Sequence, residues 1–425
     1  MQKIYTWKKI HWIGYMSALI LFIACRLEPL PMPPFDYLLT NLDPSFDKIY
    51  LYDAAQLRNK DIIAVGKVLL KTGEFNALAV RLNSNGQVKE VKHFNSEAYW
   101  DDEIFCMTID SSENIYMAGR VRDPNLIFRG IVFKISTKDS LHKIWHRMYP
   151  PPLNSRLTLS RIVSYNQEEL TVLRGTLSGQ ERLDTTAVAG FFRIDSMGWI
   201  RSCNQNYPYY DIKGAALIHK QVVFGGVAYN VSRQDGPGIV SCLEPLTCSV
   251  QHRSHFAEVH SEFNYIADVA RGSDGHILTV LNANFLEPNQ SIPQKRFYFR
   301  PYFIKMLPQM GLPVVNDQTA YIELPSDTIM ERHAVSSLIG TQDGGFIYAS
   351  NYTNHEVFND FYAKITKRST NLGAGMMWTE PLKLPQTSIS KIVPLADNAI
   401  LLLAGRNLEV EINRIIKVSS QGNIE

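Results

Sequence analysis

The chain has 425 residues, of which 45% are hydrophobic and 20% charged, so it holds enough apolar material for a folded core. Its formal net charge is only +2, and basic residues form no more than short clusters. This balance excludes a strongly basic nucleic-acid-binding protein. Aromatic residues make up 11% of the chain, which favours β-structure, where flat side chains pack well on a pleated surface.

The N-terminal segment has the features of an export signal. Three lysines among the first nine residues precede an apolar stretch, residues 12–23, which is too short to be read first as a membrane span. The stretch ends at Ala24 and Cys25, a pair that resembles the lipobox of bacterial lipoproteins. The resemblance implies that residues 1–24 are a lipoprotein signal peptide and that Cys25 is acylated. An ordinary cleaved signal peptide and an uncleaved anchor are the alternatives.

A proline-rich segment follows the lipidation candidate. Four prolines between residues 29 and 34 favour an extended, semi-rigid stalk, so residues 25–35 are predicted to hold the folded domain away from a membrane. We therefore expect a lipid-anchored protein of the cell envelope, an outer-membrane lipoprotein that faces either the periplasm or the cell surface. Its folded part is expected to be one domain, residues 36–425.

Cysteine spacing permits one disulfide and no metal site. Cys242 and Cys248 flank a short turn, and an exported protein meets an oxidising compartment, so a hairpin would bring the two sulfurs within bonding range. Two separate buried thiols are the alternative. No CxxC pair and no Cys/His zinc spacing is present, so no metal and no cofactor is expected.

A short apolar run with one basic residue recurs about every 50 to 60 residues. Turn residues such as 83–86 follow several copies, and short apolar runs that end in turns predict strands. The basic residues are Arg81, Lys134, Arg193, Lys305, Lys364 and Lys417, and a degenerate seventh copy carries Cys242 at this position. Because these residues recur once per unit, we expect them to close salt bridges between units or to cover apolar surface with their stems.

Each copy belongs to a unit of four predicted strands, named a to d in chain order, with the basic residue on strand c. Four-stranded units repeated radially are typical of a β-propeller. The seventh unit lacks its fourth strand, whereas residues 36–42 read as a strand with no unit of their own. The sequence therefore predicts an all-β, seven-bladed β-propeller whose last blade is closed by an N-terminal strand. Six or eight blades are the alternatives if one degenerate unit is misread.

One unit also carries a family resemblance. Asp343-Gly344-Gly345-Phe346-Ile347, followed by residues 360–364 and Trp378, resembles the repeats of uncharacterised β-propeller lipoproteins of the Bacteroidetes group of bacteria. The resemblance covers roughly residues 36–425. It implies the fold and an envelope location, and it supplies no catalytic residues.

The b–c and d–a connections are longer and more varied than the other turns, and in a propeller they share one face. Binding residues concentrate in loops on a rigid scaffold, so this face is the predicted site. The candidates are mainly aromatic rings, which stack on sugars or peptide side chains, together with nearby charged groups. They are Tyr99, Trp100, Asp101, Tyr209, Tyr210, Arg296, Tyr298, Arg300 and Tyr352.

Two of these stretches also have an interpretation that involves no binding role. Asp101 and Asp102 would suit acid–base catalysis or a calcium ion, but adjacent residues on a strand point to opposite faces, which favours a solvated pair. The insertion at residues 282–302 would otherwise pack its aromatic side chains onto its own blade.

The sequence lacks the motifs of several enzyme classes. It has no Gly-rich phosphate loop, no GxSxG elbow and no HExxH helix, so no enzymatic activity is expected. The main functional expectation is a lipoprotein whose propeller face binds a glycan, a peptide or an envelope protein. A glycan hydrolase or lyase with a site in the central funnel is one alternative. A structural subunit of an outer-membrane complex is another.

Overall fold

The computed structural model describes residues 36–39, 42–97, 100–125, 127–149, 158–165, 169–175, 188–208, 210–228, 237–247, 249–256, 263–286, 297–307, 321–323, 331–354, 361–370, 377–378, 380–405 and 413–425. The chain divides into two units, and the unit that spans residues 35–424 is the one described below. All its regular elements in the described residues are strands. Among the same residues, none forms a helix with the length and apolarity needed to span a bilayer.

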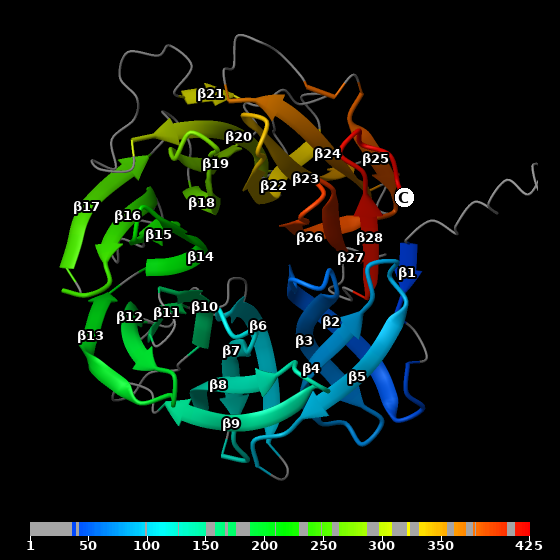
Figure 1. Ribbon diagram of the computed structural model, residues 1–425. Coiled ribbons are helices and arrows are strands. Elements are labelled where there is room, and N and C mark those ends of the chain that lie inside the picture. Colours follow the sequence, from blue (N-terminus) through cyan, green and yellow to red (C-terminus); the bar gives the residue numbers. More distant parts are fainter. Residues whose placement is uncertain are drawn as a thin grey trace, which may run out of the picture. The chain divides into compact units, whose positions relative to one another are not determined.

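Seven four-stranded antiparallel sheets are arranged in a ring, one after another along the chain (Figure 1). Blade 1 consists of β2 (Phe46–Gln56), β3 (Ile62–Leu70), β4 (Phe75–Leu82) and β5 (Val88–Phe94). Blade 2 consists of β6 (Asp101–Ile109), β7 (Ile115–Arg122), β8 (Phe128–Ser136) and β9 (His142–Tyr149). Blade 3 consists of β10 (Thr158–Ser164), β11 (Glu169–Gly175), β12 (Val188–Asp195) and β13 (Ile200–Pro208).

The remaining blades follow the same order. Blade 4 consists of β14 (Tyr210–Ile218), β15 (Gln221–Ala228), β16 (Gly238–Glu244) and β17 (Ser249–Phe256). Blade 5 consists of β18 (Phe263–Arg271), β19 (Ile277–Leu286), β20 (Phe297–Met306) and β21 (Tyr321–Glu323). Blade 6 consists of β22 (Glu331–Gly340), β23 (Gly345–Asn354), β24 (Phe361–Ser369) and β25 (Leu382–Pro385). Blade 7 consists of β26 (Ser388–Pro394), β27 (Ile400–Gly405), β28 (Arg414–Val418) and β1 (Asp36–Leu38).

The two ends of the domain share blade 7. Strand β1 pairs with β28, with Asp36 opposite Ile416 and Leu38 opposite Arg414. This pairing gives the last blade its fourth strand and covers the edge that β28 would otherwise expose. The predicted seven-bladed propeller, closed by an N-terminal strand, is confirmed, although the closing strand is shorter than the predicted residues 36–42.

Apolar side chains fill each junction between neighbouring blades. Seven clusters of buried residues are present, and each joins two consecutive blades, including blades 7 and 1. In the cluster between blades 7 and 1, for example, Leu51 and Leu78 pack with Leu401 and Ile415. Apolar residues therefore face both sides of most inner and middle strands, which explains why the sequence shows continuous apolar runs.

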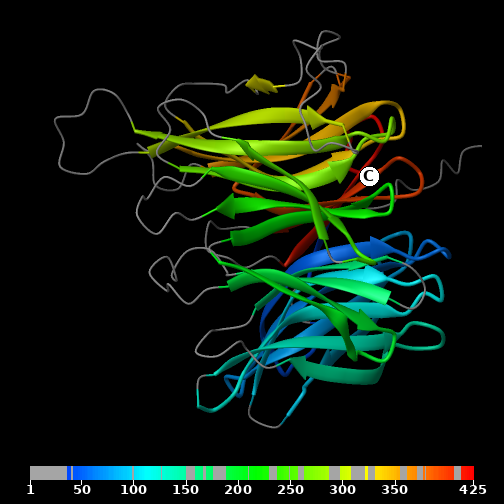
Figure 2. The same cartoon turned by 90° about the vertical axis from the view of Figure 1, so that its left-hand side faces the viewer.

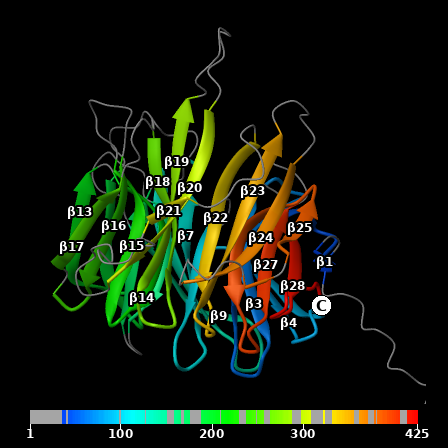
Figure 3. The same ribbon diagram turned by 90° about the horizontal axis from the view of Figure 1, so that it is seen from above.

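The strands of all blades run between the same two faces of the ring (Figures 2 and 3). The a–b and c–d turns, such as residues 57–61 and 83–87, lie on one of them, here called the short-turn face (right side of Figure 2). Most of the longer b–c and d–a connections, at the opposite face, lie outside the described residues.

Every innermost strand contains a β-bulge at the same place. The register with the second strand shifts between Leu51 and Asp53 in blade 1 and at the equivalent place in each other blade. The bulge pushes a carbonyl toward the second strand, where the sequence has Gly66 in blade 1. A Cβ on Gly66 would stand 1.8 Å from the Tyr50 carbonyl oxygen, so only glycine fits there. The same holds for Gly119 in blade 2, where a Cβ would stand 1.9 Å from the Glu103 carbonyl oxygen.

Four basic residues of strand c form ion pairs within their own blade, and the expectation of salt bridges between blades is wrong for these four: Arg81, Arg193, Lys305 and Lys417. Arg81 pairs with Asp61 of the same blade at 2.9 Å, and Lys305 pairs with Asp274 at 2.8 Å. The acids lie in the a–b turns, directly beside strand c. The link to the next blade is instead a hydrogen bond from Arg81 to the Thr137 carbonyl oxygen, 3.0 Å long.

Candidate functional site

The residue that follows each bulge belongs to an innermost strand of the propeller. We call these seven equivalent residues the axial ring: Asp53, Cys106, Arg161, Gly214, Asp268, Ser337 and Lys391. Each lies three or four residues before the end of its strand, so the ring is set back roughly 10 Å from the short-turn face. The shared bulge therefore places one residue from every blade at an equivalent position on the innermost strand.

Charge alternates around this ring. The four charged members come from blades 1, 3, 5 and 7, and the members from blades 2, 4 and 6 are Cys106, Gly214 and Ser337. The ring thus carries two carboxylates and two cations, and its formal charge is zero. The amino group of Lys391 lies 3.3 Å from Oδ2 of Asp268. This contact links blade 7 to blade 5, although blade 6 lies between them in the ring. Side chains of non-adjacent blades therefore meet near the axis.

Hydrogen bonds fix the carboxylates of the ring in place. Oδ2 of Asp53 accepts from the backbone N–H of Met107, in the next blade, at 2.9 Å. Oδ2 of Asp268 accepts from the N–H of Leu338 at 3.1 Å, also one blade further on. The hydroxyl of Ser337 donates to Asp268 and accepts from the N–H of Ile392 in blade 7. These bonds join neighbouring blades and hold the acids in one orientation.

Burial shifts the pKa values of two ring members, Asp53 and Cys106. Burial raises the pKa of Asp53, although Lys391 and Arg161 lie close enough to oppose the shift. A carboxylate with a raised pKa is a stronger base and is suited to moving protons. Burial also raises the pKa of the Cys106 thiol to about 12, so this thiol stays protonated and is not a nucleophile.

Exposure also differs among the charged members. Asp268 has a side chain only 4% exposed, whereas that of Lys391 is 25% exposed. Asp53 and Arg161 are half-buried. Three of the four charged side chains therefore keep surface that a ligand can reach, and Asp268 acts by holding Lys391.

The candidate residues from the sequence that the structure describes are mostly occupied by contacts within the fold. Trp100 packs against the apolar cluster between blades 1 and 2, and Asp101 forms an ion pair with Arg122. Tyr352 is only 2% exposed and stacks on Tyr362 with 4.7 Å between ring centroids, so its predicted role in ligand binding is wrong. Arg300 is partly buried on β20, opposite Ala283.

The other candidates stay predictions. Tyr99, Tyr209, Arg296, Cys248 and Cys25 lie outside the described residues. Tyr210 begins β14 and Tyr298 lies on β20, but their side chains are outside what the structure describes.

Asp102 corrects the expectation of a solvated acidic pair. It is fully buried, and one of its oxygens accepts from the N–H of Ser96 at 2.9 Å. The other oxygen has no hydrogen-bond partner among the described residues. Burial raises the pKa of this carboxyl to about 7. Asp101, by contrast, is partly exposed, accepts the N–H of Phe75 in blade 1 at 3.1 Å and pairs with Arg122.

The expected Cys242–Cys248 disulfide is also corrected. Cys242 is a free, buried thiol, and the residue opposite it in the neighbouring strand is His252. A register shift after Cys242 pairs Leu243 with Val250, so the hairpin does not present Cys242 to the residues of the turn. The alternative of a buried thiol therefore holds for Cys242.

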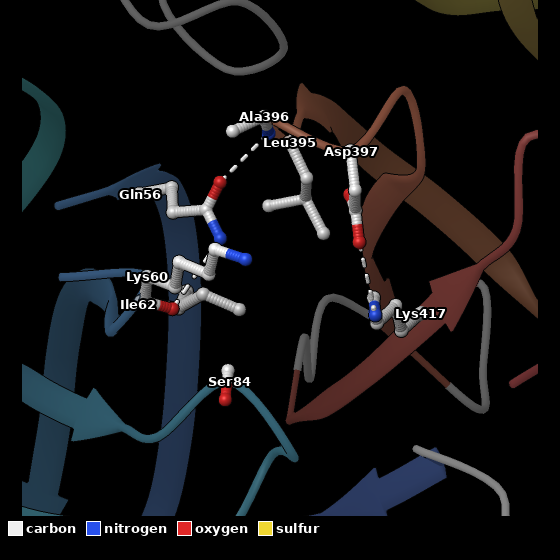
Figure 4. Close-up of a pocket in the computed structure, with 8 residues that line it drawn as sticks. All are labelled: Gln56, Lys60, Ile62, Ser84, Leu395, Ala396, Asp397 and Lys417. Atoms are coloured by element: carbon white, nitrogen blue, oxygen red, sulfur yellow. Dashed lines mark hydrogen bonds and ion pairs between the residues drawn. The ribbon is translucent and has the colours of Figure 1, made fainter. Parts of the chain in front are cut away.

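A small pocket lies on the short-turn face between blades 1 and 7 (Figure 4). Its volume is about 170 Å³, and its walls include Gln56, Lys60, Ser84, Leu395, Asp397 and Lys417. The side chain of Gln56 accepts from the N–H of Ala396 at 2.7 Å, and Lys417 pairs with Asp397 at 3.4 Å. Since ligand pockets usually exceed roughly 300 Å³, this pocket is small for an extended substrate. Among the described residues, no three His, Cys, Asp or Glu side chains converge as a metal site.

Comparisons with known proteins support the fold. No protein-family model matches the chain, and no curated protein matches it either. A solved structure of an ulvan lyase, described as a new family of polysaccharide lyase and bound to -[GlcA(1-4)Rha3S]-, is similar with a TM-score of 0.52. The identity is 10%, over 89% of this chain and 96% of the lyase. The β-propeller domain of the Trilobed protease from Pyrococcus furiosus is similar with a TM-score of 0.47 and 10% identity, over 88% and 93% of the two chains.

These comparisons overturn one expectation. We expected no enzymatic activity because catalytic motifs are missing from the sequence. A propeller of similar architecture is itself a polysaccharide lyase, so the missing motifs do not argue against catalysis on this fold. At 10% identity the likeness shows the fold alone, and the chemistry has to be argued from the residues of this chain.

Proposed function

We propose that the protein is a glycan-active enzyme that cleaves an acidic polysaccharide at the axial ring. The observation that carries the proposal is the convergence of two carboxylates and two cations from blades 1, 3, 5 and 7 near the centre of the propeller. Titratable groups gathered from distant parts of a chain, with burial that shifts their pKa values, are typical of catalytic sites.

The cations of the ring favour an acidic substrate. Arg161 and Lys391 are the basic residues near Asp53, and both keep partly exposed side chains. A guanidinium or ammonium group binds a sugar carboxylate or sulfate by charge-assisted hydrogen bonds. The ligand of the similar ulvan lyase, -[GlcA(1-4)Rha3S]-, carries both kinds of acidic group.

Elimination is the reaction that such a set of groups supports best. A base removes the proton from the carbon next to the sugar carboxylate, the electron pair forms a C=C bond, and the C–O bond to the next sugar breaks. The leaving oxygen then takes up a proton. In this proposal Arg161 and Lys391 stabilise the charge that develops on the carboxylate. Asp53, with its raised pKa, moves the proton.

The test is an activity screen of the purified full-length protein in detergent against a panel of acidic and neutral polysaccharides. Elimination produces an unsaturated sugar that absorbs ultraviolet light, whereas hydrolysis produces new reducing ends without that absorbance. We expect the unsaturated product from an acidic polysaccharide. Reducing ends without ultraviolet absorbance would show that the enzyme acts by hydrolysis and not by elimination. The absence of any product from any polysaccharide would refute the proposal.

We also propose that the enzyme is exported and acylated at Cys25, as an outer-membrane lipoprotein of a bacterial envelope. The support is the basic and apolar N-terminal sequence that ends at Ala24 and Cys25. Expression in a bacterium fed with a radiolabelled fatty acid tests this, and we expect label in the wild type and none in Cys25→Ser. Equal labelling of the two proteins, or none in the wild type, would contradict it.

A further inference from the structure

The c–d turn of blade 3 differs from equivalent turns in what it exposes. In blades 1, 3 and 7 the first residue of the turn accepts two backbone N–H groups, from residues two and four positions later. A glycine with φ between 80° and 92° occupies the fourth position in all three. The geometry of the turn is therefore the same in the three blades, and their side chains can be compared position by position.

At the two exposed positions of this turn, blades 1 and 7 carry only amides. Asn85 and Gln87 stand in blade 1, and Gln421 and Asn423 stand in blade 7. Blade 3 carries instead Met197, 61% exposed, and Trp199, 55% exposed. Since the same turn forms with amides, its geometry requires neither large apolar residue. Large apolar side chains that the turn does not need, exposed together on one turn, point to a ligand.

Contacts with blade 2 hold Trp199 in place. The guanidinium carbon of Arg147, on β9, lies 3.8 Å from the centroid of the Trp199 ring, and its Nε donates to the Met197 carbonyl oxygen at 3.4 Å. The hydroxyl of Tyr149 donates to the Gly198 carbonyl oxygen at 2.9 Å. The indole therefore loses little conformational freedom on binding, which favours affinity.

We propose that Trp199 and Arg147 form a docking platform for a sugar residue of an acidic polysaccharide, on the outer rim of blades 2 and 3. The C–H groups of a pyranose face are apolar and weakly positive, so they stack on the negative face of an indole. The guanidinium group of Arg147 contacts the indole, and Arg201 follows two residues after Trp199 with a side chain that is 58% exposed. Both match the acidic groups of the sugar. The choice of an acidic polysaccharide as the ligand depends on the proposed function.

The position of the platform suits a long substrate. β9 and β13 are the outermost strands of their blades, so three strand spacings of roughly 4.8 Å separate the platform from the innermost strands that carry the axial ring. A polymer cleaved at the centre can therefore be held at the rim as well. Short oligosaccharides cannot occupy both places, and they should not depend on Trp199.

A membrane surface and a second copy of the chain are the competing occupants. Membrane surfaces attract clusters of four or more Lys and Arg, whereas the platform pairs one of its two arginines with a carboxylate, Arg201 with Asp195 at 2.7 Å. An indole beside charged, hydrogen-bonded groups fits a sugar better than either alternative.

The test compares Trp199→Gln with a matched control in the full-length protein in detergent. The glutamine is the residue that the equivalent position of blade 1 carries, so the turn should fold. Leu246→Gln is the control, because Leu246 lies on the c–d turn of blade 4 and is also 55% exposed. Binding is measured by electrophoresis through gels that contain the acidic polysaccharide, together with the rate of cleavage of polymer and of short oligosaccharides.

We expect Trp199→Gln to weaken polymer binding about tenfold, to leave the cleavage of short oligosaccharides unchanged, and Leu246→Gln to bind as the wild type does. Unchanged polymer binding by Trp199→Gln would overturn the platform even if the enzyme is active. Trp199-dependent binding without any cleavage would support the platform and refute the proposed function. Trp199-dependent pelleting with anionic vesicles, or loss of a dimer in Trp199→Gln, would overturn the sugar assignment.

Discussion

Two regions of the molecule hold an aspartate with a raised pKa, and their surroundings differ. In the axial ring, Asp53 lies near two cations and both its oxygens accept backbone N–H groups. In the junction between blades 1 and 2, Asp102 has one oxygen without a hydrogen-bond partner among the described residues. A pKa shift in the same direction therefore accompanies a carboxylate with both oxygens hydrogen-bonded at the proposed site and an under-satisfied one inside the fold. A raised pKa alone does not identify a catalytic residue.

The largest expected effect concerns the axial ring. Replacing Asp53 by Asn keeps an oxygen acceptor but removes the group that moves a proton, so we expect activity to fall about 10³-fold. Thermal unfolding should change by only a few degrees. Asp47→Asn, at an exposed carboxylate on the same strand, is the control and should be fully active. Normal turnover by Asp53→Asn would show that the axial ring is not the catalytic site.

The second effect concerns the pH dependence of stability. The pKa of Asp102 is raised from 3.8 to about 7, mainly by burial. Below pH 4 the carboxyl is protonated in the folded and unfolded states, so it costs nothing. Between pH 4 and 7 only the unfolded state loses its proton, so the free energy of unfolding falls by on the order of 4 kcal/mol and stays lower above pH 7.

The variant Asp102→Asn isolates this contribution, because an amide does not titrate. Urea unfolding from pH 4 to 8 should show a smaller loss of stability with pH in the variant than in the wild type. The variant Asp47→Asn should keep the wild-type slope. Parallel slopes for Asp102→Asn and the wild type would show that Asp102 is ionised in the folded protein at neutral pH.

A third effect separates the structural from the chemical role of the ring. Lys391→Met leaves the nearly buried Asp268 without its cation, and we expect a loss of about 3 kcal/mol in the free energy of unfolding. The double variant with Asp268→Asn should recover most of this loss, whereas Lys60→Met, at an exposed lysine, should cost little. If the single and double variants are equally destabilised, the ion pair does not hold the ring together.

The fold was predictable from sequence to a large extent, and the site was not. Repeated apolar runs and turns predict seven blades, and the unpaired segment at residues 36–42 predicts the closure, because both signals are local in the chain. The axial ring has no such signal. Its members, such as Asp53 and Lys391, share neither residue type nor neighbouring motif, and only the bulge at the same place in each inner strand brings them together.

Individual side chains were mispredicted for a related reason. Tyr352 lies near a loop in the sequence, yet the register of β23 and β24 stacks it on Tyr362 inside blade 6. Trp199 lies in a turn that reads as ordinary turn chemistry. Only the equivalent turns of blades 1 and 7, seen in space, show that its indole is not needed there. Exposure is thus a property of register and packing, which residue type does not reveal.

The smallest expected effect concerns Asp101, which lies next to Asp102 at the start of β6. Asp101 is the neighbour of Asp102 in sequence but faces the other side of the sheet, where it pairs with Arg122, whose side chain is 43% exposed. Solvent and salt screen an exposed ion pair, so Arg122→Ala should cost less than about 1 kcal/mol. High salt should shrink that cost further, while it should leave the effect of Asp102→Asn nearly unchanged. If Arg122→Ala lowers the free energy of unfolding as much as the loss of a buried ion pair does, then Asp101 and Asp102 do not differ in burial as described.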